Sequence, residues 1–200
     1  MTDRNGTPAV RHLLPDRLFH WVMAVCVIVL GATAFLPIVG FRFDWVPVHW
    51  MTGIVLTLAV LFHLYRVFVV HGIGGMLPGG DDAREAVRAI KGCGSEGLSP
   101  AKYDAFQKAY HLAAALTVLV LLATGLVMLA KIDTIFWRRD PSILTDATWG
   151  AVYVLHGLGA MALLFLVILH VYFSLLPEHR DILAAMIRGH GPELSRKGTE

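Results

Sequence analysis

The sequence predicts an all-α integral membrane protein, a four-helix bundle that ends in a cytoplasmic amphipathic helix. Its 200 residues are 56% hydrophobic and only 16% charged, whereas an ordinary globular domain has about 25% charged residues. Four runs lack Asp, Glu, Lys and Arg, and each reaches or exceeds the roughly 20 residues that a helix needs to cross the hydrocarbon core. These runs are residues 18–41, 45–65, 109–130 and 147–177.

We therefore expect residues 1–200 to form a single transmembrane domain. Its helices are predicted at about 18–39, 47–70, 106–130 and 149–176. The first helix is expected to stay in the mature protein, because the stretch after Arg17 is overlong and shows no clear small-residue cleavage site.

Two shorter amphipathic helices are expected outside the membrane. One covers residues 81–91, in the long connection between the second and third helices. The other covers residues 178–190 and should lie at the cytoplasmic interface. The side chains that it should turn inward are Ile182, Leu183, Met186 and Ile187.

Basic residues predict the orientation, because segments that stay in the cytoplasm carry an excess of Lys and Arg. The N-terminal tail, the long connection and the C-terminal tail are the basic segments. Their residues are Arg4, Arg11 and Arg17, then Arg84, Arg88, Lys91 and Lys102, and then Arg180, Arg188, Arg196 and Lys197. The other two connections hold only Arg42, and Lys131, Arg138 and Arg139. We expect a multi-pass protein of a bacterial-type inner membrane, with both termini in the cytoplasm.

Several kinds of redox chemistry are excluded by the sequence. Cys26 and Cys93 match neither the spacings that bind iron–sulfur clusters nor the motif that attaches haem covalently. The chain also has no nucleotide-binding fingerprint and no molybdenum or nickel site. Membrane lipid is an expected partner, and nucleic acid is not.

Histidines are the unusual feature of the apolar runs. Of ten in the chain, six belong to these runs: His20, His49, His63, His111, His156 and His170. An ionisable side chain inside a bilayer is costly and tends to face the protein interior, where it binds a ligand or pairs. One such histidine alone is explained equally well by a hydrogen bond between helices, but so many in a small protein indicate a shared partner.

The spacing of His156 and His170 favours haem iron as that partner. Residues 14 apart on a helix turn through about 1400°, close to four turns, and rise about 21 Å. The two side chains therefore project from one face, near opposite membrane surfaces. Two haems at two depths need one histidine each from this helix and one each from another helix. Zinc ligands gather about 2 Å from one ion, which this separation forbids.

Helix direction suggests the partner histidines. His49 begins the second helix, which runs parallel to the fourth, so it lies at the depth of His156. The first helix runs the other way, so His20 lies at the depth of His170. His63 follows His49 by the same 14 residues, so a second scheme pairs His63 with His170. The glycines that would let a flat macrocycle approach are Gly31, Gly53, Gly157 and Gly159.

Four ordered motifs resemble a known family. DRLFHW (16–21), VHWMTG (48–53), LHGLGA (155–160) and ILHVY (168–172) are similar to the histidine motifs of the cytochrome b, or gamma, subunit of membrane-bound formate dehydrogenases, and of related hydrogenase cytochrome b subunits. The resemblance spans nearly the whole chain. It implies two non-covalent b-type haems, one held by His20 and His170 on the cytoplasmic side and one by His49 and His156 on the outer side.

A fifth motif, AKYDAFQK (101–108), resembles the K-Y-N-A-G-Q-K segment with which this family lines a quinone pocket. It implies a site for menaquinone or ubiquinone, although Asp104 and Phe106 depart from the pattern. The quinone-site candidates are Tyr103, Asp104, Gln107 and His111, and Asp104, His111 or His63 are candidates to relay protons. The candidates to bind haem propionates are Arg17, Arg66 and Lys108. Without the haem motifs, the same stretch would be interpreted as a solvated helix start capped by Ser99.

The predicted function is that of an electron-transfer subunit. It would connect an iron–sulfur subunit on the outer side, itself bound to a catalytic subunit, with a quinone near the cytoplasmic side. In the alternative direction, quinol oxidised here would feed a reductase of a sulfur compound or another substrate. An alternative from another class is a metal or proton transporter lined by histidines. Whether the chain itself is an enzyme depends on the quinone step.

Overall fold

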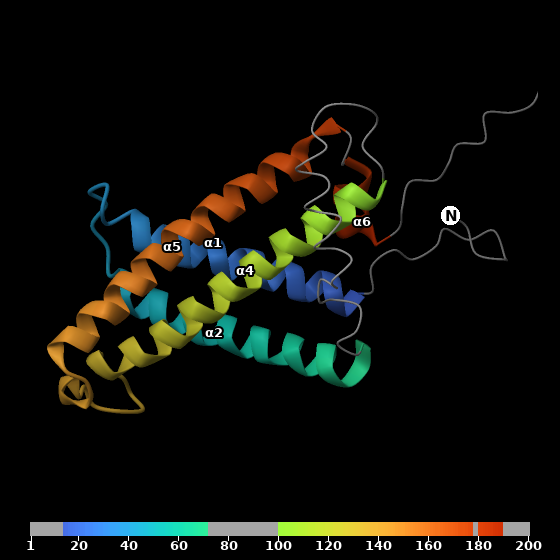
Figure 1. Cartoon of the computed structure of the whole chain (residues 1–200). Coiled ribbons are helices and arrows are strands. Elements are labelled where there is room, and N and C mark those ends of the chain that lie inside the picture. Colours follow the sequence, from blue (N-terminus) through green and yellow to red (C-terminus); the bar gives the residue numbers. More distant parts are fainter. Residues whose placement is uncertain (1–13, 72–99, 178–179, 190–200) are drawn as a thin grey trace, which may run out of the picture. The chain divides into compact units, whose positions relative to one another are not determined.

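The computed structural model describes residues 14–71, 100–177 and 180–189, and most of these residues are helical (Figure 1). Within these ranges there is no strand, and four helices are long and apolar enough to cross a membrane. They are α1 (Leu14–Phe35), α2 (Trp45–Arg66), α4 (Pro100–Met128) and α5 (Asp146–Leu175). The all-α fold with four spans is therefore confirmed.

Prolines lie near the ends of the spans. Pro15 and Pro100 belong to the described N-terminal turns of α1 and α4, where the N–H that proline lacks would have no partner within the helix. α1 ends at Phe35, before Pro37, and the turn that follows contains Gly40 with φ of 100°. Only glycine adopts this backbone conformation without strain.

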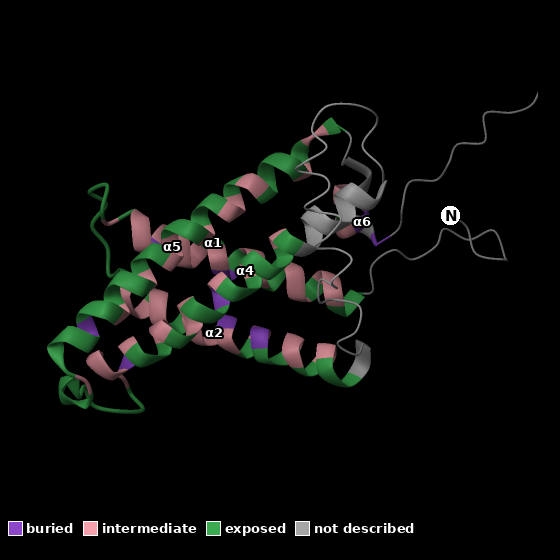
Figure 2. Cartoon of the chain, in the orientation of Figure 1, coloured by how far each residue is buried: buried purple, intermediate pink, exposed green. Residues whose placement is uncertain are grey.

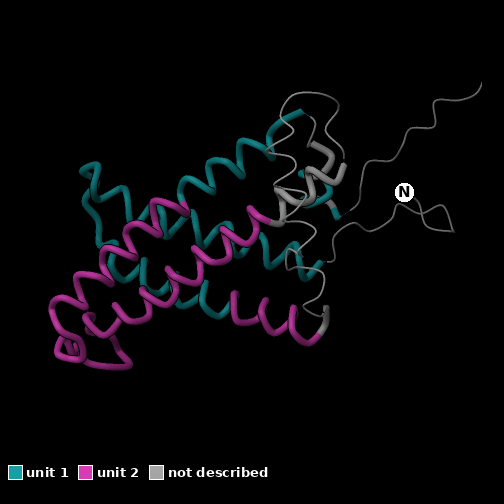
Figure 3. The backbone as a smooth tube through the Cα atoms, in the orientation of Figure 1, with its two compact units in different colours: residues 1–59, 164–200 teal, residues 60–163 magenta. Residues whose placement is uncertain are grey.

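The chain divides into two compact units (Figure 3). Unit 1 consists of residues 1–59 and 164–200, which contain α1, the first part of α2, the end of α5 and α6 (Arg180–Arg188). Unit 2 consists of residues 60–163, which contain the end of α2, α4 and the first part of α5. The end of α2 continues into a π-helical turn, Val67–His71.

Most side chains on the four spans are exposed or half-buried (Figure 2). Ile28 and Leu58 are 65% and 62% exposed, whereas the buried apolar side chains include Leu56 and Val118. Large apolar side chains exposed over whole helices indicate that lipid, and not water, surrounds them.

In unit 1, the amphipathic helix α6 is bound to α1 through Arg17. Its guanidinium donates to the carbonyls of Met186, at 3.0 Å, and Ile187. A cation at a helix C-terminus satisfies unpaired carbonyls and interacts favourably with the helix dipole. Gly189, directly after α6, has φ of 88°, and a Cβ built on it would lie 2.5 Å from Arg17 Nη1.

The predicted inner face of α6 is partly correct. Ala185 is fully buried, and Leu183 and Met186 are half-buried. Ile187 is 53% exposed on the isolated chain, so its orientation toward the membrane interface stays a prediction. The side chain of Ile182 and the helix expected at 81–91 lie outside the described residues.

In unit 2, the connection from α4 to α5 is held by two tryptophans. It contains two short 3₁₀ helices, η3 (Leu129–Lys131) and η4 (Pro141–Ile143). Trp149 Nε1 donates to the Pro141 carbonyl at 2.8 Å, and Trp137 Nε1 donates to the Leu129 carbonyl at 3.0 Å. The Lys131 ammonium lies 4.4 Å from the ring centre of Trp149, a cation–π contact. These bonds fix where α5 begins.

Candidate haem-ligand site

Two of the predicted ligands face each other within unit 1. His20 of α1 and His170 of α5 have ring centroids 6.1 Å apart, with their planes tilted by 57°. A transition metal lies about 2.0–2.1 Å from an imidazole nitrogen, so rings that bind one ion from opposite sides have centres roughly 6 Å apart. The two histidines therefore fit the separation that a pair of axial haem ligands requires.

His49, the third predicted ligand, is hydrogen-bonded to α1. Its Nδ1 lies 2.8 Å from the Oγ1 of Thr33. Thr33 is only 4% exposed, and its hydroxyl also donates to the Val29 carbonyl of its own helix, at 2.8 Å. The ring of Trp45 lies edge-on to His49, with centroids 6.2 Å apart. The imidazole is thus held between two neighbours.

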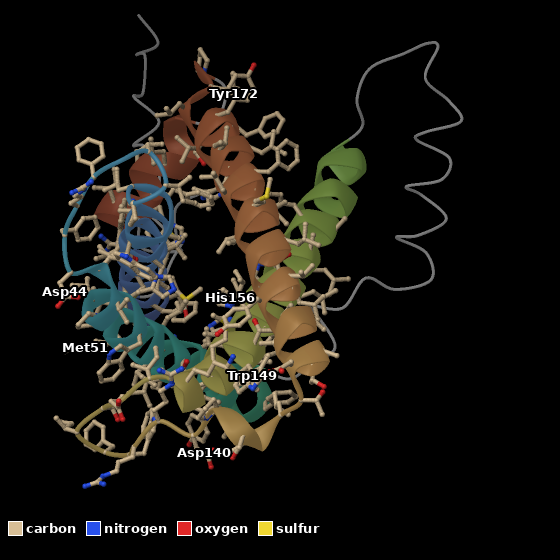
Figure 4. The ribbon with its side chains drawn as sticks, turned by 90° about the vertical axis from the view of Figure 1, so that its left-hand side faces the viewer. Asp44, Met51, Asp140, Trp149, His156 and Tyr172 are labelled. Carbon is tan, nitrogen blue, oxygen red and sulfur yellow. The ribbon has the colours of Figure 1, made fainter. Side chains whose placement is uncertain are left out.

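His156, the fourth predicted ligand, is labelled in Figure 4 and has the same kind of partner in unit 2. Its Nδ1 lies 2.9 Å from the Oγ1 of Thr124 on α4. The Thr124 hydroxyl donates to the Val120 carbonyl at 2.7 Å. A Cβ on the next residue, Gly125, would lie 3.3 Å from His156 Cε1, so the glycine lets the ring approach α4 closely.

Three of the four glycines predicted beside the ligands have open space in front of them. A Cβ built on Gly31, Gly53 or Gly157 meets no atom within 4 Å. A flat macrocycle can approach the backbone at such positions. Gly159 is different, because its Cβ would lie 3.1 Å from Leu121 Cδ2. Gly159 thus lets Leu121 approach α5 closely, and its place beside a macrocycle stays a prediction.

The other two histidines of the apolar runs, His63 and His111, belong to unit 2. His63 is half-buried on α2, one turn before Arg66, and His111 is exposed on α4. Among the described residues, no three side chains of His, Cys, Asp or Glu gather as a metal cluster would require. The histidines of the described residues thus suit a metal that takes two axial ligands.

The predicted propionate and quinone groups are only partly described. Arg17 binds the carbonyl end of α6, and Arg66 is half-buried in the last turn of α2. The backbones of Tyr103, Asp104 and Gln107 belong to the first turns of α4. Their side chains, like that of Lys108, lie outside the described residues.

Sequence reasoning missed three residues of this site: Thr33, Thr124 and Gly125. Each acts on a histidine of the next helix along the chain. A threonine or glycine inside an apolar run is ordinary by itself, because both residue types are common in membrane helices. The only sequence signal is a threonine in each helix that precedes an outer histidine.

The chain is similar to known membrane cytochromes. Residues 11–189 match the model of a family described as prokaryotic cytochrome b561. The chain is also 25% identical, over 188 residues, to the formate dehydrogenase cytochrome b556 subunit of Haemophilus influenzae, covering 85% of this chain and 72% of that protein. A match over most of its length shows that this chain belongs to the prokaryotic cytochrome b561 family, and it is thus a multi-pass membrane cytochrome b that binds b-type haem and transfers electrons.

Proposed function

We propose that this chain is the di-haem cytochrome b subunit of a membrane oxidoreductase like formate dehydrogenase. It would pass electrons between an iron–sulfur partner on the outer side and a quinone near the cytoplasmic side. The observation that carries the proposal is the 6.1 Å between the ring centroids of His20 and His170. The similarity to the formate dehydrogenase cytochrome b556 subunit of Haemophilus influenzae supports the kind of complex.

Four histidines would hold the two haems: His20 with His170 on the cytoplasmic side, and His49 with His156 on the outer side. A b-type haem supplies a centre that accepts and donates single electrons. The apolar helices around the ligands keep water away, and this exclusion of water tunes the potential. The catalytic subunit would carry the dehydrogenase chemistry, because this chain lacks the motifs for it.

The quinone, menaquinone or ubiquinone, would bind beside the cytoplasmic haem. The candidate residues are Tyr103, Asp104, Gln107 and His111, of which the first three belong to the first turns of α4. Quinone reduction consumes two protons with two electrons, so Asp104, His111 or His63 would take protons from the cytoplasm. The excess of basic residues on the termini supports this orientation in a bacterial inner membrane.

Haem content tests the proposal directly. We expect pyridine haemochrome analysis of the purified chain to give two b haems, and one per chain would overturn the di-haem arrangement. His20→Ala should lose the cytoplasmic haem, because one axial ligand is removed. His63→Ala should keep both haems and slow quinone turnover. His190→Ala, outside the apolar runs, serves as the control.

The reverse result would favour the second ligand scheme. If His63→Ala loses one haem and His20→Ala keeps both, then His63 is the partner of His170. The partner subunits are tested separately, by identifying the proteins that co-purify with the chain in mild detergent. An iron–sulfur subunit is expected among them, and purification of the chain with a transport protein instead would contradict the proposed complex.

A further inference from the structure

The two outer histidines have the same hydrogen-bond partner. A threonine hydroxyl lies 2.8 Å from Nδ1 of His49 and 2.9 Å from Nδ1 of His156. Thr33 comes from the helix that precedes His49 in the chain, and Thr124 from the helix that precedes His156. The arrangement occurs once in unit 1 and once in unit 2. It therefore recurs at two sites built from different helices.

The surroundings of each threonine allow its oxygen to act as the acceptor in these pairs. A hydroxyl has one hydrogen and two lone pairs. The Thr33 hydroxyl has the Val29 carbonyl of its own helix as an acceptor at 2.8 Å, and the Thr124 hydroxyl has that of Val120 at 2.7 Å. With its hydrogen used in this way, each threonine oxygen has a lone pair for Nδ1–H of the histidine, and this is the direction adopted in the proposal below.

This direction fixes the tautomer of each imidazole. A neutral histidine carries one ring hydrogen, so a ring protonated on Nδ1 has its lone pair on Nε2. Metals bind the nitrogen that has the lone pair, and the hydrogen bond of the other nitrogen sets both tautomer and ring rotation. Threonine suits this role, since its branched Cβ restricts the hydroxyl to few rotamers.

We propose that Thr33 and Thr124 are positioning residues for the outer haem, each holding its histidine as the Nδ1–H tautomer with Nε2 directed to the iron. The inference rests on the proposed function, which makes His49 and His156 the ligands. Accepting a hydrogen bond from Nδ1–H also makes the imidazole a stronger electron donor, which favours oxidised iron. The two threonines would thus lower the reduction potential of the outer haem relative to a haem whose histidine ligands lack these hydrogen bonds.

Valine substitution tests this role with little change in shape. Thr33→Val and Thr124→Val replace the hydroxyl by a methyl group, and Thr33→Ser and Thr124→Ser retain it. The matched controls are Thr57→Val on α2 and Thr117→Val on α4. These two threonines donate to the carbonyls of Gly53 and Ala113, each at 2.8 Å within their own helix.

Three measurements would be made on the purified protein: haem content, the midpoint potential of each haem, and the electron paramagnetic resonance spectrum of the oxidised form. We expect each valine variant to raise the outer potential and shift its low-spin signal, or to bind the outer haem roughly 10-fold more weakly. The serine variants should approach the parent protein, and the two controls should match it.

The outcomes distinguish an error in the ligand assignment from an error in the positioning role of the two threonines. If His49→Ala and His156→Ala retain both haems, the ligand assignment of the proposed function is wrong. If those variants lose the outer haem while both valine variants keep its content, potential and signal, only the positioning role is wrong. If the control variants lose haem as the valine variants do, helix stability explains the loss and the positioning role is again rejected.

Discussion

Gly125 lies so close to the ring of His156 that a side-chain carbon atom at this position would press against the ring. A Cβ at this position would lie 3.3 Å from Cε1, closer than the 3.5–4.0 Å or so at which carbon atoms attract best. We expect Gly125→Ala to push the ring away from α4, and so to rotate a ligand of the outer haem. The low-spin signal of that haem should shift, although alanine favours the helix by up to about 1 kcal/mol.

Gly150→Ala is the control for this substitution. Gly150 belongs to α5, and its added Cβ meets no atom within 4 Å. Gly150→Ala therefore gains the same helix propensity as Gly125→Ala, but its added methyl group does not touch His156. Equal spectra for the two alanine variants would show that the contact of Gly125 has no influence on the ligand.

The connection between α4 and α5 depends on a capping carboxylate. Asp140 accepts hydrogen bonds from the hydroxyl of Ser142 and from its backbone N–H, the latter at 2.9 Å. These two bonds hold the pKa of Asp140 below its ordinary value of 3.8, and the bond from the Ser142 hydroxyl has the larger effect. The contribution of the cap to stability is therefore complete above that value, and it is lost as the pH falls through the lower folded pKa.

We expect acid to loosen this connection, and Asp140→Asn to remove most of the pH dependence. Hydrogen exchange of residues 132–145 between pH 5 and about pH 2.5 measures the effect, with rates corrected for the chemical exchange of an unstructured chain. Asp146→Asn, in the first turn of α5, is the control. A pH dependence that persists in Asp140→Asn would assign it to another group.

The proposed orientation of the chain rests on its basic segments and can be tested with cysteines. Ile135, in the connection between α4 and α5, is 90% exposed, and Cys93 belongs to the long basic connection. We expect a membrane-impermeant maleimide to label Ile135→Cys from outside intact spheroplasts, and to label Cys93 only after permeabilisation. Cys26 is 5% exposed and should stay unlabelled in both cases. The opposite pattern would place the termini outside.

Hydropathy alone predicted the four spans and the C-terminal helix, because a bilayer requires long apolar helices whatever their neighbours are. The bounds of the spans stay predictions, because α1 and α4 are described only from Leu14 and Pro100 onward. The facing of His20 and His170 agrees with the expected depths. Thr33, Thr124 and Gly125 could not be found, because their importance lies in contacts across helices that no spacing within one helix reveals.

The hydrogen bond between Arg17 and the end of α6 joins residues 169 positions apart in the chain. A ribosome adds about 5–20 residues per second, so the arginine is made roughly 10–30 s before its acceptor carbonyls. During this interval the first span is already in the membrane without α6. The contact can therefore form only on a chain that has been translated to its last helix.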